Sequence, residues 1–162
     1  MRKTLPLFAS LAVFAVLSGF PFAGTVEAQE PSIVGSWITT GWDGVEGDPR
    51  PGLLIFTETN YSMMFVPGGM VRERYAGETM TEADMLAAFK TLVANSGRYT
   101  REGDQITTEA YVALNPNYMA DWGENHLTYT FRIEGDILHI TWPESFMAEG
   151  DPPFTGTFRR VG

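Results

Sequence analysis

Short runs of branched and aromatic residues, separated by turn residues, recur throughout the sequence after residue 30. Glycine, asparagine and aspartate lie in the shortest links between runs, where they tolerate the positive φ angles of hairpin turns. Neighbouring strands should therefore be antiparallel, and a closed barrel would leave no exposed strand edge. We expect an all-β fold, an eight-stranded antiparallel up-and-down β-barrel, with strands over residues 32–40, 52–57, 61–66, 96–101, 105–114, 126–134, 137–142 and 154–161.

Residues 79–97 depart from this rhythm. Thr81 and Asp84 have the spacing of a capping box, and apolar residues then recur at helical spacing until Asn95 and Gly97. The apolar stripe consists of Met85, Leu86, Phe89, Leu92 and Val93. The pattern predicts one α-helix between the third and fourth strands, with its stripe docked against the barrel or across its mouth.

Alternation along the strands separates an inner from an outer face. Tyr129 and Phe131 share one face of their strand, whereas His126 lies on the other face. The inward side chains could line a cavity for an apolar ligand, with tyrosine hydroxyls to orient it. They could equally fill a small barrel completely. The candidate ligand-binding residues are Tyr61, Met63, Phe65, Tyr99, Tyr111, Tyr129, Phe131, Ile140 and Trp142.

The N-terminus has the features of a secretory signal peptide. Arg2 and Lys3 precede an apolar run, and Val26 and Ala28 occupy the small-residue positions that a signal peptidase reads. We expect a signal peptide over residues 1–28 and one domain over 29–162, exported to the periplasm or the extracellular space. A retained N-terminal anchor is the alternative. The chain has no cysteine, so it has neither a disulfide nor a cysteine for a lipid anchor.

Charge and composition argue against several classes of function. The net charge of −9 disfavours nucleic acids and anionic membranes as partners, and we expect no stable membrane insertion after signal cleavage. The absence of cysteine excludes thiol catalysis, and no Gly-x-Ser-x-Gly motif is present. His126 and His139, the two histidines, fall on outward faces of different strands. We therefore expect no catalytic residue, metal or cofactor.

Gly35 lies two residues before Trp37 on the first expected strand, so the two share a face. A glycine there allows a neighbouring segment to pass close to the strand. A guanidinium stacked on Trp37 would add about 1 kcal/mol of stability if it were shielded from water. Arg159 and Arg160, on the last strand, are the candidates for this contact.

The Gly-x-Trp pattern at Gly35 and Trp37 resembles the signature of calycin-type barrels. Together with "RPGLLIFT" at 50–57 and "SGRYTREGDQIT" at 96–107, it resembles the bacterial lipocalin-like domain family. The resemblance implies a barrel whose narrow end is closed by Trp37, covered by Arg159 or Arg160. The sequence lacks the Thr-Asp-Tyr turn of the better-known lipocalins, and its helix precedes the fourth strand instead of following the last.

These observations favour an exported protein that binds or carries a small hydrophobic molecule. One alternative is a small barrel enzyme with a hydrophobic substrate, in which an inward Tyr or Glu acts as acid or base. Another is a secreted interaction or inhibitor protein with a filled barrel, in which the loop 41–51 or the N-terminus would plug a partner. An exposed apolar patch would favour this alternative. The sequence specifies neither the ligand nor the oligomeric state.

Overall fold

The computed structural model of the chain describes residues 31–75, 79–119, 126–144 and 153–162. The expected signal peptide, residues 1–28, lies outside this part of the chain. Within the described residues no helix is long and apolar enough to cross a membrane.

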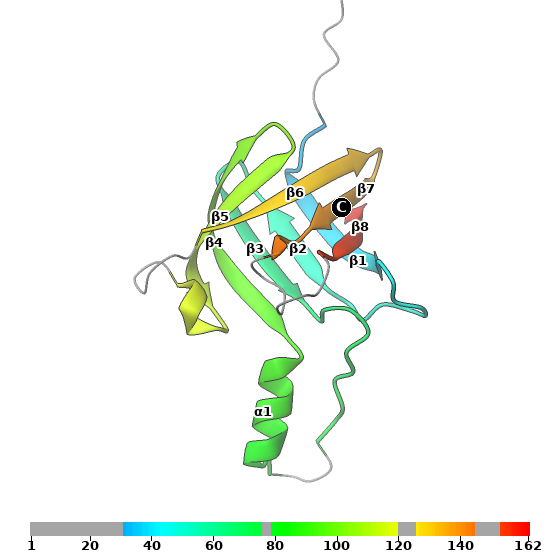
Figure 1. Ribbon diagram of the computed structural model, residues 1–162, viewed down its shortest axis with the longest axis vertical. Coiled ribbons are helices and arrows are strands. Elements are labelled where there is room, and N and C mark those ends of the chain that lie inside the picture. The colour runs from blue at the N-terminus through cyan, green and yellow to red at the C-terminus, as the bar shows by residue number, and fades with distance from the viewer. Residues whose placement is uncertain (1–30, 76–78, 120–125, 145–152) are drawn as a thin grey trace, which may run out of the picture. The chain divides into compact units, whose positions relative to one another are not determined.

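Eight antiparallel strands of the described chain form a closed barrel in which each strand pairs with its neighbours in sequence and β8 pairs with β1 (Figure 1). This confirms the expected fold. The strands are β1 (Gly35–Trp42), β2 (Leu53–Phe56), β3 (Asn60–Phe65), β4 (Val93–Glu102), β5 (Gln105–Ala113), β6 (His126–Glu134), β7 (Ile137–Thr141) and β8 (Thr155–Val161). A helix, α1 (Glu82–Lys90), precedes β4, and a short 3-10 helix, η1 (Pro116–Tyr118), follows β5.

β4 begins earlier than the sequence pattern predicts. Val93, Asn95 and Gly97, which we expected in or at the end of the helix, pair with β3. Gly97 lies at an irregularity in the pairing of β4 with β5, where a Cβ atom would come within 2.0 Å of the carbonyl oxygen of Glu109. The glycine is therefore needed for the close approach of two strands and does not end a helix.

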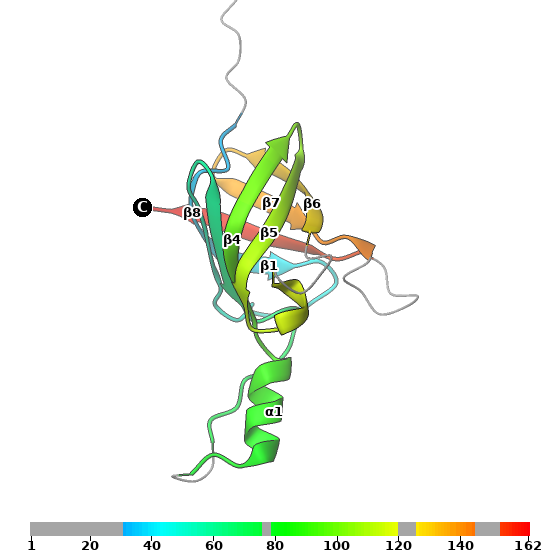
Figure 2. The same ribbon diagram turned by 90° about the vertical axis from the view of Figure 1, so that its left-hand side faces the viewer.

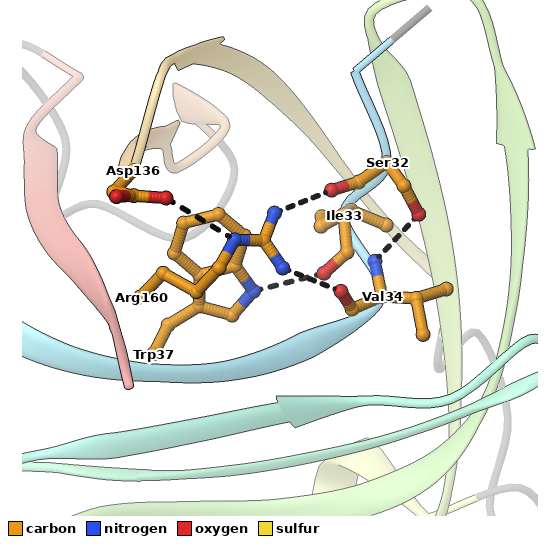
Figure 3. Close-up of polar contacts among 6 residues, drawn as sticks. All are labelled: Ser32, Ile33, Val34, Trp37, Asp136 and Arg160. Atoms are coloured by element: carbon orange, nitrogen blue, oxygen red, sulfur yellow. Dashed lines mark hydrogen bonds and ion pairs between the residues drawn. The ribbon is translucent and has the colours of Figure 1, made fainter. Parts of the chain in front are cut away.

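Trp37 lies near the start of β1, at the end of the barrel that we call the closed end, beside Arg160 and residues 32–34 (Figure 3). Its ring is fully buried, and the guanidinium of Arg160 lies over it. Gly35 has a φ of 139°, and a Cβ atom there would lie 2.5 Å from Nη1 of Arg160. Arg160 therefore covers the ring of Trp37 and Gly35 leaves room for its guanidinium, whereas Arg159 is exposed.

The barrel interior is tightly filled. Fully buried side chains occupy its length, among them Leu54, Ile106, Leu138 and Phe158. At the other end, which we call the open end, an aromatic cluster fills one side. It consists of Trp42, Phe65, Trp142, Phe154 and Phe158, with neighbouring ring centroids 5.0 to 6.4 Å apart.

α1 forms where expected but does not dock its stripe on the barrel. The capping box is confirmed, because Thr81 and Asp84 exchange hydrogen bonds, and the helix ends at Lys90. No residue of α1 is buried, and the helix extends away from the open end (Figures 1 and 2). Within the stripe, Met85, Leu86 and Phe89 are 48, 54 and 45 % exposed, whereas Leu92 and Val93, which follow the helix, are partly buried, and Val93 packs against the barrel core.

Candidate functional site

A pocket with a volume of about 190 Å³ lies at the open end, beside the aromatic cluster. β6 runs from Leu127, in the pocket wall, towards Asp136, whose carbonyl oxygen accepts a hydrogen bond from the backbone of Arg160 at the closed end. The pocket and the Trp37 closure therefore occupy opposite ends of the barrel. The described lining residues are Tyr61, Phe89, Lys90, Leu92, Val93, Ala94, Asn95, Thr108, Ala110, Leu114, Asn115, Tyr118, Leu127 and Tyr129.

Tyr61, Thr108 and Tyr129 place hydroxyl groups at the inner side of the pocket. All three side chains are buried, and Thr108 donates to the carbonyl oxygen of Leu127 at 3.3 Å. Burial raises the pKa of Tyr61 from 10.0 to about 12, and a hydrogen bond with Thr108 acts weakly in the opposite direction. Burial also raises the pKa of Tyr129, and the nearby Tyr61 adds to the effect. Both phenols are therefore neutral at physiological pH.

η1 supplies a third phenol. Its start is fixed by Asn115, whose side chain accepts a hydrogen bond from the backbone N–H of Asn117, and Pro116 lies in its first turn. This turn places Tyr118 in the pocket wall, where burial raises the pKa of its hydroxyl.

The pocket wall is mostly uncharged. Among the described lining residues, Lys90 is the only one with a charge at neutral pH, and it is exposed at the end of α1. Polar groups in the wall are hydroxyls and the amides of Asn95 and Asn115, and the remaining side chains are apolar. Such a wall suits a ligand that is largely apolar and has a neutral polar group.

The structure brings two of the predicted ligand-binding residues, Tyr61 and Tyr129, into this pocket. Six others are buried in the barrel but lie outside the described pocket lining: Met63, Phe65, Tyr99, Phe131, Ile140 and Trp142. Tyr99, for example, donates its hydroxyl to the carbonyl oxygen of Thr57 at 2.6 Å and packs edge-to-face on Phe56.

The prediction for Tyr111 is wrong. On β5 the inward positions are Ile106, Thr108 and Ala110, all buried, so the next residue points outwards and Tyr111 is 52 % exposed. The same alternation could have identified Thr108 and Ala110 as pocket residues. Tyr118 was missed because it belongs to a turn, for which strand alternation gives no signal.

Neither histidine is among the described lining residues of this pocket. His126 is exposed, and His139 lies on the outer face of β7, with Nδ1 3.3 Å from the hydroxyl of Thr157. In the described part of the chain, no three His, Asp or Glu side chains are grouped closely enough to hold a metal ion.

No family model matches the sequence, and no curated protein is similar to it. Among solved structures, the crystal structure of a lipocalin-like protein from Bacteroides uniformis is similar, with 15 % sequence identity and a TM-score of 0.43. The match covers 79 % of this chain and 97 % of the other. The assignment of the barrel rests on the strand pairing of this chain itself.

Proposed function

We propose that this protein binds a small, uncharged and largely apolar molecule in the pocket at the open end of the barrel. The observation that supports the proposal is the pocket wall itself, in which the hydroxyls of Tyr61, Thr108 and Tyr129 adjoin apolar side chains. Two phenols held neutral by burial can donate hydrogen bonds to a carbonyl or ether oxygen of the ligand.

The pocket volume limits the part of the ligand that is enclosed. An apolar cavity of about 150 Å³ accommodates benzene. The pocket, at about 190 Å³, therefore suits one ring or a short chain with a polar substituent. A longer ligand would extend outwards past Phe89 and Lys90, which lie at the end of α1.

Binding without catalysis is favoured over an enzyme by the titratable groups in the wall. A general acid or base works best when its pKa lies near the operating pH. The shift at Tyr61 moves its pKa away from neutrality, and no carboxylate or histidine is among the described lining residues.

We also propose that the protein is exported and belongs with the lipocalin-like barrels. The basic start, apolar run and small residues of the first 28 positions support export. The stacking of Arg160 on Trp37, with Gly35 making room for the guanidinium, supports the lipocalin-like assignment.

Native mass spectrometry of the protein purified from its own host tests the proposal, followed by extraction of any bound molecule. Binding of an apolar fluorescent probe should then be compared among Tyr61→Phe, Tyr129→Phe and Tyr111→Phe. The first two remove pocket hydroxyls and should alter the affinity for an extracted ligand about fivefold. Tyr111→Phe is the matched control and should leave it unchanged. A protein that is always empty and binds no probe would refute the proposal.

A further inference from the structure

The exposed part of the apolar stripe, Met85, Leu86 and Phe89, is preceded on the same face of α1 by the carboxylate of Glu82. Glu82, Met85, Leu86 and Phe89 are spaced by three, four and seven residues, so they lie along one face of the helix over about 10 Å. Each of these side chains is exposed. A helix with an uncovered apolar face has lost the contact from which most helices in proteins derive their stability.

A second uncovered apolar surface lies on the outer face of β2 and β3. Leu53, Ile55 and Met64 are 44, 39 and 56 % exposed, and Leu53 pairs directly with Met64 across the two strands. These side chains belong to a groove of about 640 Å³, which Arg50 and Arg72 also line. We call this surface the β2–β3 groove.

No residue of α1 is among the described lining residues of the groove in its own chain, although Leu92, two residues after the end of the helix, does line it. Nη1 of Arg72 donates hydrogen bonds to the carbonyl oxygen of Ala88 at 2.8 Å and to the hydroxyl of Thr91 at 3.2 Å. These bonds fix the C-terminal end of α1 beside the segment that follows β3, and the rest of the helix extends away from the barrel (Figures 1 and 2). The stripe and the groove are therefore both available to another molecule.

We propose that α1 of one copy of this chain docks in the β2–β3 groove of a second copy. The two surfaces match in chemistry: the apolar stripe would cover Leu53, Ile55 and Met64, and the carboxylate of Glu82 would face the guanidinium of Arg50. In the proposed dimer the exchange is reciprocal, so that each copy contributes both surfaces and the same contact forms twice about a two-fold axis. Two copies of the contact bury twice the surface area that one nine-residue helix would bury, and a larger buried area favours a stable interface. Phe89 belongs both to the stripe and to the lining of the open-end pocket, so the tests change Leu53, Ile55 and Leu86, which are not among the described lining residues of that pocket.

The absence of cysteine from the chain permits a direct cross-linking test on the protein as its host processes it. Leu86→Cys and Ile55→Cys are introduced into separate chains with tags of different length, which are then mixed and oxidised. A disulfide-linked heterodimer is expected. The control pairs Leu86→Cys with Val112→Cys, which is 59 % exposed on β5 and is not among the described lining residues of the groove, and should give none.

The chain with both Leu86→Cys and Ile55→Cys distinguishes exchange between copies from folding back within one copy. An intramolecular disulfide without any heterodimer in the mixing experiment would overturn the proposal, because α1 would then cover its own groove. Absence of both products would overturn it as well.

Sedimentation equilibrium gives the second test. The unmodified protein should form a dimer, and Leu53→Glu or Leu86→Glu should each weaken it about tenfold or more. Val112→Glu should not. Glu82→Arg alone and Arg50→Glu alone should weaken the dimer, and the two together should restore it. A protein that stays monomeric at high concentration, or a dimer insensitive to these changes, would refute the proposal.

Discussion

The guanidinium of Arg160 lies 4.0 Å from the ring centroid of Trp37 and also donates to the carbonyl oxygens of Val34 and Ser32, at 2.7 and 2.8 Å (Figure 3). The indole N–H of Trp37 in turn donates to the carbonyl oxygen of Ile33 at 2.8 Å. One arginine of the last strand thus joins the segment before β1 to the ring that closes the barrel.

Replacing this arginine should destabilise the protein. Arg160→Met keeps much of the apolar bulk but removes the cation–π contact and two charge-assisted hydrogen bonds, so the free energy of unfolding should fall by about 2 to 3 kcal/mol. Urea denaturation measures this. Arg159→Met, at the exposed neighbouring position, is the control and should change stability by less than about 0.5 kcal/mol. Equal effects of the two changes would contradict the role assigned to Arg160.

Gly35→Ala should also destabilise the closed end. Its φ of 139° is unfavourable for alanine, and the added Cβ would lie 2.5 Å from Nη1 of Arg160. We expect a loss of about 2 kcal/mol or more in thermal or urea unfolding. At Gly44 φ is 74° and no atom lies within 4 Å of the added Cβ. Gly44→Ala should therefore lower the free energy of unfolding by about 1 kcal/mol, because of the unfavourable φ angle alone. In a chain that already carries Arg160→Met, Gly35→Ala should lower the free energy of unfolding by a smaller amount, because Nη1 is no longer present. If the effects of the two changes simply add, the clash between the added Cβ and Arg160 is not the cause.

The buried phenols predict instability at alkaline pH. Below about pH 10 Tyr61 is protonated in both the folded and the unfolded chain, so its contribution to stability is fully present. Between about pH 10 and its folded pKa of about 12, only the unfolded chain releases the proton, and the free energy of unfolding falls with rising pH. The fall should reach about 1.4 kcal/mol per pH unit for this residue.

Urea denaturation across this alkaline range tests the linkage, with phenolate absorbance to follow ionisation. Tyr61→Phe should reduce the slope. Tyr111→Phe, at an exposed site, serves as the reference. A slope that is the same in both variants would show that Tyr61 ionises equally in the folded and unfolded chain.

Thr81→Ala should affect α1 without affecting the barrel. The Thr81 hydroxyl accepts a hydrogen bond from the backbone N–H of Asp84, and such caps contribute about 1 kcal/mol to helix stability. Hydrogen exchange of the amides within α1 should therefore become faster. Because no residue of α1 is buried, the free energy of global unfolding should change by less than about 0.5 kcal/mol. Thr81→Ser retains the acceptor and should preserve protection. Global destabilisation by Thr81→Ala would mean that α1 supports the barrel.

The order of the strands was predictable because alternation and turn chemistry are local signals. Gly103 and Gly135, for example, adopt φ angles of 59° and 60° in the β4–β5 and β6–β7 turns, as their sequence context indicates. The start of β4 was not predictable, because Leu92 and Val93 continue the helical spacing by coincidence. Gly97 is needed because a Cβ atom there would clash with the carbonyl oxygen of Glu109 on β5. The residues next to Gly97 in the sequence do not indicate this contact.

The site was predictable only in part. Tyr61 and Tyr129 follow from strand alternation, and so does the outward position of Tyr111, once Ile106 and Thr108 are assigned to the inner face. Whether inward side chains leave a space depends on how they pack together, which alternation does not determine. Phe65 and Trp142 are therefore in a packed cluster, although they share the inner face with Tyr61 and Tyr129.

The pairing of β8 with β1 also sets the order of events during biosynthesis. Trp37 pairs with Arg160, so the barrel has a gap between its first and seventh strands until almost all of the described chain has been synthesised. Contacts between such distant residues give a high contact order and slow folding. The emerging polypeptide therefore exposes unpaired strand edges until the last strand has been synthesised, and such edges are sites at which unfolded chains can associate.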